Sequence, residues 1–211
     1  MDVAIVLYPR FTALDAIGPY EVLRNLPGTT VTLVAESPGE VRNDVGGLGL
    51  VADAALHELP SPDVVVVPGG PGQADQMAPG VLHEWLRAAH ATSTFTTSVC
   101  TGSLILASAG ILDGLAATCH WLYLDQLRDF GVTPTSERVV EQGRIVTAAG
   151  VSSGIDMALR LAAHIAGDEI AQAIQLGIEY DPQPPFDAGS PDKAPADIVD
   201  FLRSNARAVM G

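Results

Sequence analysis

Cys100 stands where a predicted strand gives way to a predicted helix. Residues 94–99 before it are β-branched and aromatic, which is typical of a buried strand. The residues from Gly102 onward are small and apolar and predict a buried helix. Free backbone N–H groups and the dipole at a helix start favour a thiolate. The pattern predicts a nucleophile elbow built on sulfur, with an accessible thiolate of low pKa. The alternative is a small buried hydrophobe that ends a strand.

Asp15 follows the first apolar run, residues 3–8, which predicts a strand covered on both faces. It lies just before or at the start of a predicted helix, in whose first turn Pro19 would fit. An aspartate at this place is commonly an N-cap, and that reading stays open beside a chemical one.

Gly69 and Gly70 follow a four-valine run, residues 64–67, that predicts a central parallel strand. Glycines let backbone N–H groups approach a ligand closely, so we expect the turn at Gly70 to supply an N–H that faces the Cys100 corner. Ligands bind at the carboxyl ends of the strands in such sheets. The ends of the strands should therefore bring Asp15, Gly70, Cys100 and Thr101 together, which favours a nucleophilic Cys100 and an Asp15 that is more than a cap.

Cys119 and His120 are harder to assign. Cys119 has no elbow pattern around it and is interpreted as structural. His120 could act as a base for Cys100 or could be a packing residue at a helix start, and the pattern favours packing. No spacing of cysteine, histidine and carboxylate residues resembles a zinc site.

Composition narrows the class of protein. The chain has 211 residues, of which 47% are hydrophobic and 17% charged, as in compact globular proteins. A net charge of −14 argues against nucleic acid or an anionic membrane as partner and fits a neutral or cationic small molecule. Two cysteines make no disulfide framework, and we see no targeting signal and no membrane-spanning run. We therefore expect a cytoplasmic location.

Strand and helix patterns alternate along the chain, without a repeat or a clear domain boundary. They predict one α/β domain over residues 1–211, with a mostly parallel sheet and helices on both faces. Residues 41–52 predict two short strands at the edge of this sheet. Further strands are predicted at 31–35 and 144–150, and helices at 79–91, 118–130, 155–166, 168–180 and 196–208.

The chain resembles the ThiJ/PfpI superfamily and, within it, the isonitrile hydratases. The resemblance implies a flavodoxin-like three-layer sandwich, related to the class I glutamine amidotransferases, and a homodimer with the active site near the interface. It places the nucleophile on Cys100, the acid/base carboxylate on Asp15 and an assisting hydroxyl on Thr101. Cys119 departs from the threonine expected there. The matching segments are 14–19, 68–70, 97–103, 120–121, 154–156 and 179–192.

The activity that this resemblance implies is the addition of water to an isonitrile, giving an N-substituted formamide. Cys100 would attack the isonitrile carbon to form a covalent thioimidate, and Asp15 would carry the protons. Backbone N–H groups near Gly70 and Thr101 would stabilise the thiolate or the intermediate, and no metal or organic cofactor is needed.

Two other classes stay open. One is a different cysteine-dependent enzyme of the superfamily, such as a glyoxalase-like or deglycase-like protein, or a redox sensor that uses Cys100. The other is the ligand-binding domain of a transcription regulator. A regulator needs a basic helix-turn-helix extension, and the acidic chain makes this reading the weakest.

Overall fold

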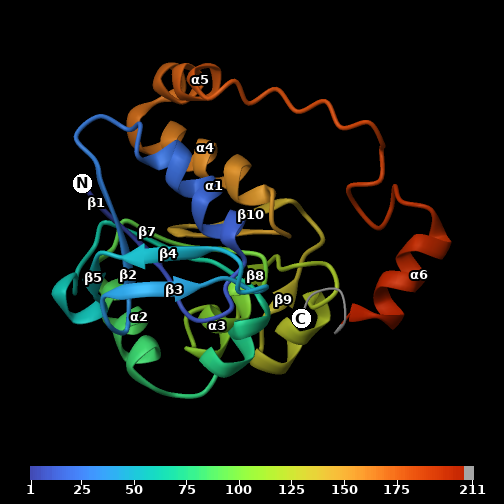
Figure 1. The fold of residues 1–211 in the computed structure, drawn as a ribbon, viewed down its shortest axis with the longest axis horizontal. Coiled ribbons are helices and arrows are strands. Elements are labelled where there is room, and N and C mark those ends of the chain that lie inside the picture. Colours follow the sequence, from blue (N-terminus) through green and yellow to red (C-terminus); the bar gives the residue numbers. More distant parts are fainter. Residues whose placement is uncertain (207–211) are drawn as a thin grey trace.

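The computed structural model describes residues 1–206 (Figure 1). Its 7-stranded central sheet has the strand order β10-β11-β7-β6-β1-β2-β5. Neighbouring strands are parallel except for β10, which runs antiparallel to β11. The strands are β1 (Asp2–Val6), β2 (Thr30–Ala35), β3 (Gly39–Arg42), β4 (Gly49–Ala52), β5 (Ala54–Ala55), β6 (Val64–Val67), β7 (Phe95–Val99), β8 (Ala116–Ala117), β9 (Thr133–Pro134), β10 (Val139–Gln142) and β11 (Ile145–Ala148).

Helices cover both faces of this sheet, as the sequence predicts. In Figure 1, α1 and α4 lie on one face, with α5 beyond them, and α2 and α3 lie on the other. The helices are α1 (Ala13–Leu23), α2 (Val81–Thr92), α3 (Gly102–Ser108), α4 (Ser153–Ala166), α5 (Asp168–Gly177) and α6 (Ala196–Ser204), with 3-10 turns η1 (Leu56–Glu58), η2 (Pro71–Gln76) and η3 (Leu124–Phe130). The α/β class with a mostly parallel, flavodoxin-like sheet is confirmed.

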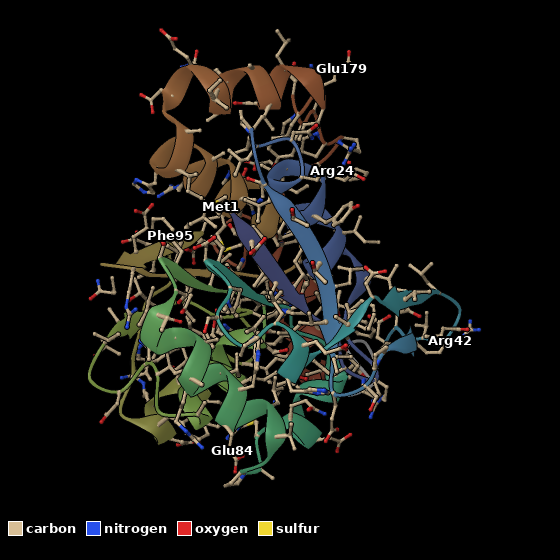
Figure 2. The ribbon with its side chains drawn as sticks, turned by 90° about the vertical axis from the view of Figure 1, so that its left-hand side faces the viewer. Met1, Arg24, Arg42, Glu84, Phe95 and Glu179 are labelled. Atoms are coloured by element: carbon tan, nitrogen blue, oxygen red, sulfur yellow. The ribbon has the colours of Figure 1, made fainter. Side chains whose placement is uncertain are left out.

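The central strands form because their side chains are apolar on both faces. All four valines of β6 are fully buried, and so are Val3, Ala4 and Ile5 of β1. A strand that is apolar on both sides is stable only between two layers of helices. The side on which the chain adds strands to the sheet changes at β1. β2 lies on one side of β1, and β6 lies on the other side. Figure 2 shows the same layers from the side.

The predicted edge strands within 41–52 are placed differently from the expectation. β3 and β4 pair only with each other, antiparallel, and form a separate two-stranded sheet. The hairpin closes on itself because the Asn43 N–H donates to the carbonyl oxygen of Leu48. The outer strands of the main sheet are instead β5 and β10.

The predicted helix over 118–130 is wrong for its first half. Only the 3-10 turn η3 forms, and residues 118–120 have no regular structure. Ser103 Oγ donates to the carbonyl oxygen of Thr118, at 2.6 Å. The N–H of Leu122, which would bond that carbonyl in an α-helix, donates to a ring nitrogen of His120 instead. Both partners of the first helical hydrogen bond are therefore engaged elsewhere.

Two predicted helix ends also shift. α5 ends at Gly177 rather than near residue 180. α6 ends at Ser204, and positions 207 and 208 of the predicted last helix lie outside the described residues.

Gly102 allows α3 to begin directly against the end of β6. A Cβ at this position would collide with the carbonyl oxygen of Val67 and would lie 2.9 Å from that of Pro68. Both are backbone atoms at the end of β6, which cannot move aside as a flexible side chain can.

We expect Gly102→Ala to lower the free energy of unfolding by about 3 kcal/mol or more, because the added methyl overpacks a rigid backbone contact. Gly177→Ala is the control, since a Cβ there meets open space at the end of α5. It should be neutral or stabilising by up to about 1 kcal/mol. Urea unfolding midpoints measure both variants, and equal midpoints would contradict the packing argument.

Candidate active site

Cys100 occupies a sharp turn between β7 and α3, as the elbow pattern predicts. β7 ends at Val99 and α3 begins at Gly102. The backbone of Cys100 has φ +59°, a conformation that costs energy for a residue with a side chain. Its N–H donates to the carbonyl oxygens of Ala148 and Ala149, both at 3.0 Å, at the end of β11. These bonds hold the strained turn in place.

Asp15 lies inside α1, which begins at Ala13, two residues earlier than the aspartate. Its side chain is fully buried, and Oδ2 accepts a hydrogen bond from the Gly69 N–H at 2.9 Å. The other oxygen, Oδ1, is buried and has no hydrogen-bond partner within residues 1–206. The N-cap reading of Asp15 is therefore wrong. Pro19 likewise sits in the helix interior, not in its first turn.

Thr101 is held by the glycine turn that follows β6. The Gly70 N–H donates to Thr101 Oγ1 at 2.9 Å, and this hydroxyl donates to the Gly70 carbonyl oxygen at 3.3 Å. The Gly70 N–H thus points to the Cys100–Thr101 corner, where the Thr101 hydroxyl accepts it. A Cβ on Gly69 would lie 2.9 Å from the Cβ of Cys100, so only glycine permits this approach. Gly69 thus brings the aspartate and the cysteine corners together.

Burial dominates the electrostatics of Asp15. It raises the pKa of this carboxyl to about 8, against the lowering effects of the Gly69 N–H and the Cys100 side chain. The nearby Asp44 also raises the pKa of Asp15, by a smaller amount. At neutral pH the Asp15 carboxyl therefore holds a proton in the resting protein.

The Cys100 thiol is fully buried, which overturns the expectation of an accessible thiolate of low pKa. Burial raises the pKa of Cys100 well above its ordinary value, and Asp15 and Cys119 raise it further. The N–H groups of Val151 and Thr101 point to the sulfur and lower the pKa, as expected for a helix start, but they do not outweigh burial. Cys100 and Asp15 thus rest as a neutral pair.

Tyr8 is a residue of this corner that the sequence reasoning missed. It follows β1 and is buried, and its hydroxyl donates to the Pro68 carbonyl oxygen at 2.8 Å. Burial, and then Asp15 and Cys100, raise the pKa of its phenol, so the ring lies near both groups. In the sequence, Tyr8 continues an apolar run and carries no signal beyond its place at a strand end.

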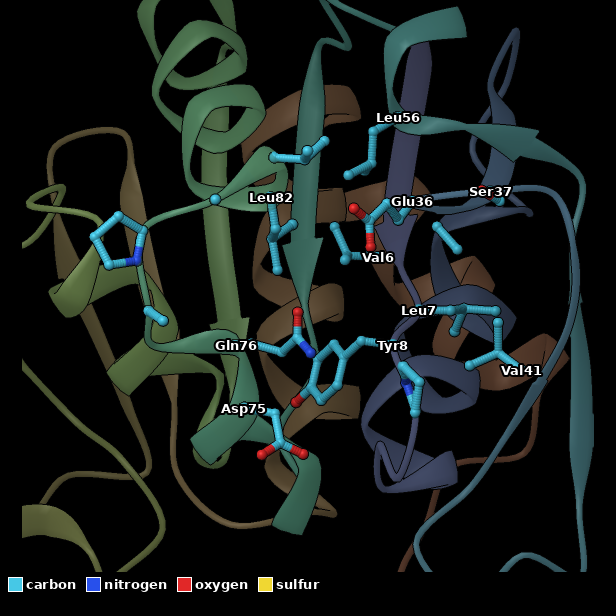
Figure 3. Close-up of a pocket in the computed structure, with 16 residues that line it drawn as sticks. Val6, Leu7, Tyr8, Glu36, Ser37, Val41, Leu56, Asp75, Gln76 and Leu82 are labelled. Atoms are coloured by element: carbon cyan, nitrogen blue, oxygen red, sulfur yellow. The ribbon is translucent and has the colours of Figure 1, made fainter.

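Two cavities flank the pair. One, of about 450 Å³, opens between the ends of β1 and β2 and the segment that precedes α2. Figure 3 shows Tyr8, Asp75 and Gln76 along its wall. Neither Cys100 nor Asp15 lines it, and Tyr8 is the wall residue that also lies near them.

The second cavity, of about 420 Å³, lies beside the elbow. Its wall includes Ala149 and Val151, which the backbone and the sulfur of Cys100 contact by hydrogen bonds. Cys119 and His120 form another part of the wall, and the C-terminal tail closes it with Gly189–Asp192. Neither Cys100 nor Asp15 lines this cavity either, but its wall contains backbone that the Cys100 corner contacts, and we call it the elbow cavity.

Cys119 and His120 are both buried in the elbow-cavity wall. Burial raises the pKa of the Cys119 thiol to about 12 and lowers the pKa of His120 to about 4. Cys119 is thus an unreactive thiol at neutral pH, and the His120 ring is uncharged.

Within residues 1–206, no group of three or more histidine, cysteine or carboxylate side chains could hold a metal ion. Over the same range, no helix is both long and apolar enough to cross a membrane.

Comparisons with known proteins identify the family of the chain. The family model described as DJ-1/PfpI matches residues 1–164. The chain belongs to the DJ-1/PfpI family. An isonitrile hydratase of Pseudomonas putida is 42% identical over 206 residues, covering 98% of this chain and 90% of that protein.

Other DJ-1/PfpI relatives include solved structures and regulators. A ThiJ/PfpI family protein from Pseudomonas syringae has a TM-score of 0.94 and 35% identity, over 98% of this chain and 86% of that one. The HTH-type transcriptional regulator GbdR of Pseudomonas aeruginosa is 33% identical over 85% of this chain, but the match covers only 51% of the regulator.

The raised pKa of Asp15 predicts that the stability of the parent protein falls as the pH rises. The folded state holds a proton that the unfolded chain releases above its ordinary pKa of 3.8, up to the folded value of about 8. Relative to Asp15→Asn, the parent should lose up to about 1.4 kcal/mol for each pH unit in this window. Urea unfolding from pH 5 to 8 measures the difference.

Asp53→Asn, at an exposed position, is the matched control for replacing an aspartate by asparagine. A difference between Asp15→Asn and the parent that stays constant from pH 5 to 8 would contradict the raised pKa.

Proposed function

We propose that the protein is an isonitrile hydratase that converts an isonitrile and water into an N-substituted formamide. The observation that carries the proposal is the buried pair of Cys100 and Asp15, in which a sulfur nucleophile lies beside a carboxyl that holds a proton at neutral pH. The substrate class comes from the Pseudomonas putida relative, which is named for this activity.

In the first step, Cys100 Sγ forms a bond to the isonitrile carbon. The proton of the thiol passes by way of Asp15 to the same carbon, so that the S–H bond is added across it. The product is a neutral thioimidate, Cys100 Sγ–CH=N–R. Asp15 ends the step with the proton count at which it began, because it accepts one proton and delivers one.

In the second step, water adds to the thioimidate carbon. Asp15 accepts a proton from the water and delivers one to the nitrogen, giving a tetrahedral carbon that bears S, OH and NHR. This intermediate collapses when its C–S bond breaks and the hydroxyl proton returns to the sulfur. The formamide leaves, and the Cys100 thiol is restored. The Thr101 N–H, which points to the sulfur, assists by hydrogen bonding to the sulfur or the intermediate. The Thr101 hydroxyl assists in the same way when it turns from the Gly70 carbonyl oxygen, which accepts its proton in the resting protein.

A neutral substrate suits this corner. The resting pair carries no charge, and burial penalises any uncompensated charge that is brought to it. An isonitrile, a thioimidate and a formamide are all uncharged. Each step therefore moves a proton over a short path without leaving a lasting charge in the buried site.

Three expectations stay predictions within this proposal. They are a single domain over residues 1–211, a cytoplasmic location, and a homodimer with the active site near the interface. The exposed Leu14, next to Asp15 in the chain, fits a site close to an interface.

The decisive assay incubates the protein with a simple alkyl isonitrile and follows the formamide. Cys100→Ser should abolish turnover, because a buried hydroxyl is a far weaker nucleophile than sulfur. Cys119→Thr is the matched control and should leave turnover nearly unchanged. Equal losses in both variants would refute the assignment of the nucleophile. Turnover of methylglyoxal but not of isonitrile would favour the glyoxalase-like alternative.

Asp15→Asn should reduce kcat by on the order of 10²–10⁴-fold, the range for a positioned acid/base, since an amide cannot accept and deliver protons in turn. Circular dichroism checks the fold, and mass spectrometry after mixing shows whether the protein gains the mass of one isonitrile. A folded Asp15→Asn protein that turns over isonitrile at nearly the parent rate would end the acid/base assignment.

A further inference from the structure

One peptide unit joins the phenol of Tyr8 to the carboxyl of Asp15. The Tyr8 hydroxyl donates a hydrogen bond to the carbonyl oxygen of Pro68 at 2.8 Å. The next group along the backbone is the Gly69 N–H, which donates to Asp15 Oδ2 at 2.9 Å. This carbonyl and this N–H belong to the same planar peptide, so the orientation of one fixes the orientation of the other. The proposed mechanism gives Tyr8 no role.

Both hydrogen bonds lie in the protein interior, since Tyr8 is 3% exposed and Asp15 is fully buried. Within residues 1–206, no donor other than the Tyr8 hydroxyl bonds the Pro68 carbonyl oxygen. A peptide whose carbonyl accepts a hydrogen bond is more strongly polarised, which strengthens the bond that its N–H donates. The Tyr8 hydroxyl therefore both aims and strengthens the hydrogen bond from Gly69 to Asp15.

The Gly69 N–H also selects the oxygen of Asp15 that carries the proton. At neutral pH this carboxyl is protonated, because its pKa is about 8. A protonated carboxyl accepts hydrogen bonds best at its carbonyl oxygen, so the N–H assigns that role to Oδ2. The proton is then on Oδ1, which is buried and has no hydrogen-bond partner in the described part of the chain. Oδ1 is thus the oxygen available to exchange a proton with the reacting atoms.

We propose that Tyr8 is a positioning residue for the acid/base Asp15, and that it acts through the peptide between Pro68 and Gly69. This inference rests on the proposed function. The Tyr8 hydroxyl holds the peptide, the N–H of that peptide holds Oδ2, and Oδ1 is thereby kept in the orientation that serves Cys100. Tyr8 needs no contact of its own with the substrate.

The same link acts on the ionisation of Asp15. The Gly69 N–H favours the carboxylate and lowers the pKa of Asp15, so a weaker bond lets this pKa rise further. The titratable groups that face Asp15 are all acids, namely Tyr8, Cys100, Cys119 and Asp44. Asp15 delivers a proton in both steps of the mechanism. Turnover should therefore fall as the pH rises through the pKa of about 8, and a higher pKa moves this fall upward.

Tyr8→Phe removes the hydroxyl and keeps the ring. With a simple alkyl isonitrile, kcat should fall by about 2- to 10-fold, the range for one neutral hydrogen bond, while KM stays unchanged. The fall of turnover at high pH should move upward by roughly a few tenths of a pH unit. Tyr20→Phe is the matched control, because Tyr20 lies in α1 and its hydroxyl makes no hydrogen bond within residues 1–206. It should keep the parent kcat and pH profile.

A double-substitution cycle separates this role from a general loss of structure. If Tyr8 acts through Asp15, Tyr8→Phe should cost no further activity in the Asp15→Asn protein, because the group that it positions is gone. Losses that multiply in the double variant would overturn the inference. A Tyr8→Phe protein with the kcat and the pH profile of the parent would overturn it as well.

Carbon NMR of labelled aspartate measures the link from Tyr8 to Asp15 without any isonitrile. The Asp15→Asn protein identifies the Asp15 carboxyl signal, and its titration should give a higher pKa in Tyr8→Phe than in the parent or in Tyr20→Phe. A merely structural role of Tyr8 would lower the free energy of unfolding and leave this pKa unchanged, which contradicts the inference.

Two further outcomes are distinguishable. If Tyr8→Phe does not fold, a ring-fluorinated tyrosine in place of Tyr8 has a more acidic hydroxyl and is a stronger donor, so it should lower the pKa of Asp15. No shift with this residue would refute the link. A parent that forms no formamide refutes the proposed function itself, whereas the titration of Asp15 still decides whether Tyr8 acts on it.

Discussion

The structure of this corner depends on the burial of one carboxyl group without a cation. Asp15 is fully enclosed, and none of the groups that shift its pKa is positively charged. A carboxylate in such a place would be strongly destabilising, so the group keeps its proton at neutral pH. The same constraint acts on Cys100, because a negative charge on either group penalises a charge on the other. The pair is therefore poised to pass protons and not to hold a charge.

Two glycines allow Asp15 and Cys100 to lie close together. Gly69 lies against the Cys100 corner and uses its N–H to bind Asp15, while Gly102 lets α3 begin against the end of β6. A side chain at either position would force the end of β6 away from the turn at Cys100. The hydroxyl of Tyr8 also connects the segment after β1 to the glycine turn, since it donates a hydrogen bond to the carbonyl oxygen of Pro68, next to Gly69. Backbone contact, more than side-chain packing, sets the geometry of the acid and the nucleophile.

The wall of the elbow cavity owes its polarity to a helix that does not form. Because Ser103 binds the carbonyl of Thr118, the segment after it stays irregular, and the Leu122 N–H turns to the His120 ring. This places a neutral imidazole, with its hydrogen on Nε2, next to the backbone that surrounds Cys100. A regular helix from residue 118 would have used the Leu122 N–H for its own backbone and left the tautomer of His120 undetermined.

The local sequence by itself determined the strand-turn-helix at Cys100, the buried strands on either side of it, and the position of Asp15 close to a strand end. These features follow from apolar runs, glycines and strand order, which act over a few residues. Only the tertiary structure decided that the Cys100 thiol is buried, that Thr101 occupies the Gly70 N–H, and that Tyr8 reaches the pair. The reason is that a pKa and a free donor depend on desolvation and on partners 30 or more residues away, as in the 31-residue separation of Gly70 and Thr101. A pattern of neighbouring residues does not contain these contacts, so the helix-start argument predicted the acidity of Cys100 with the wrong sign.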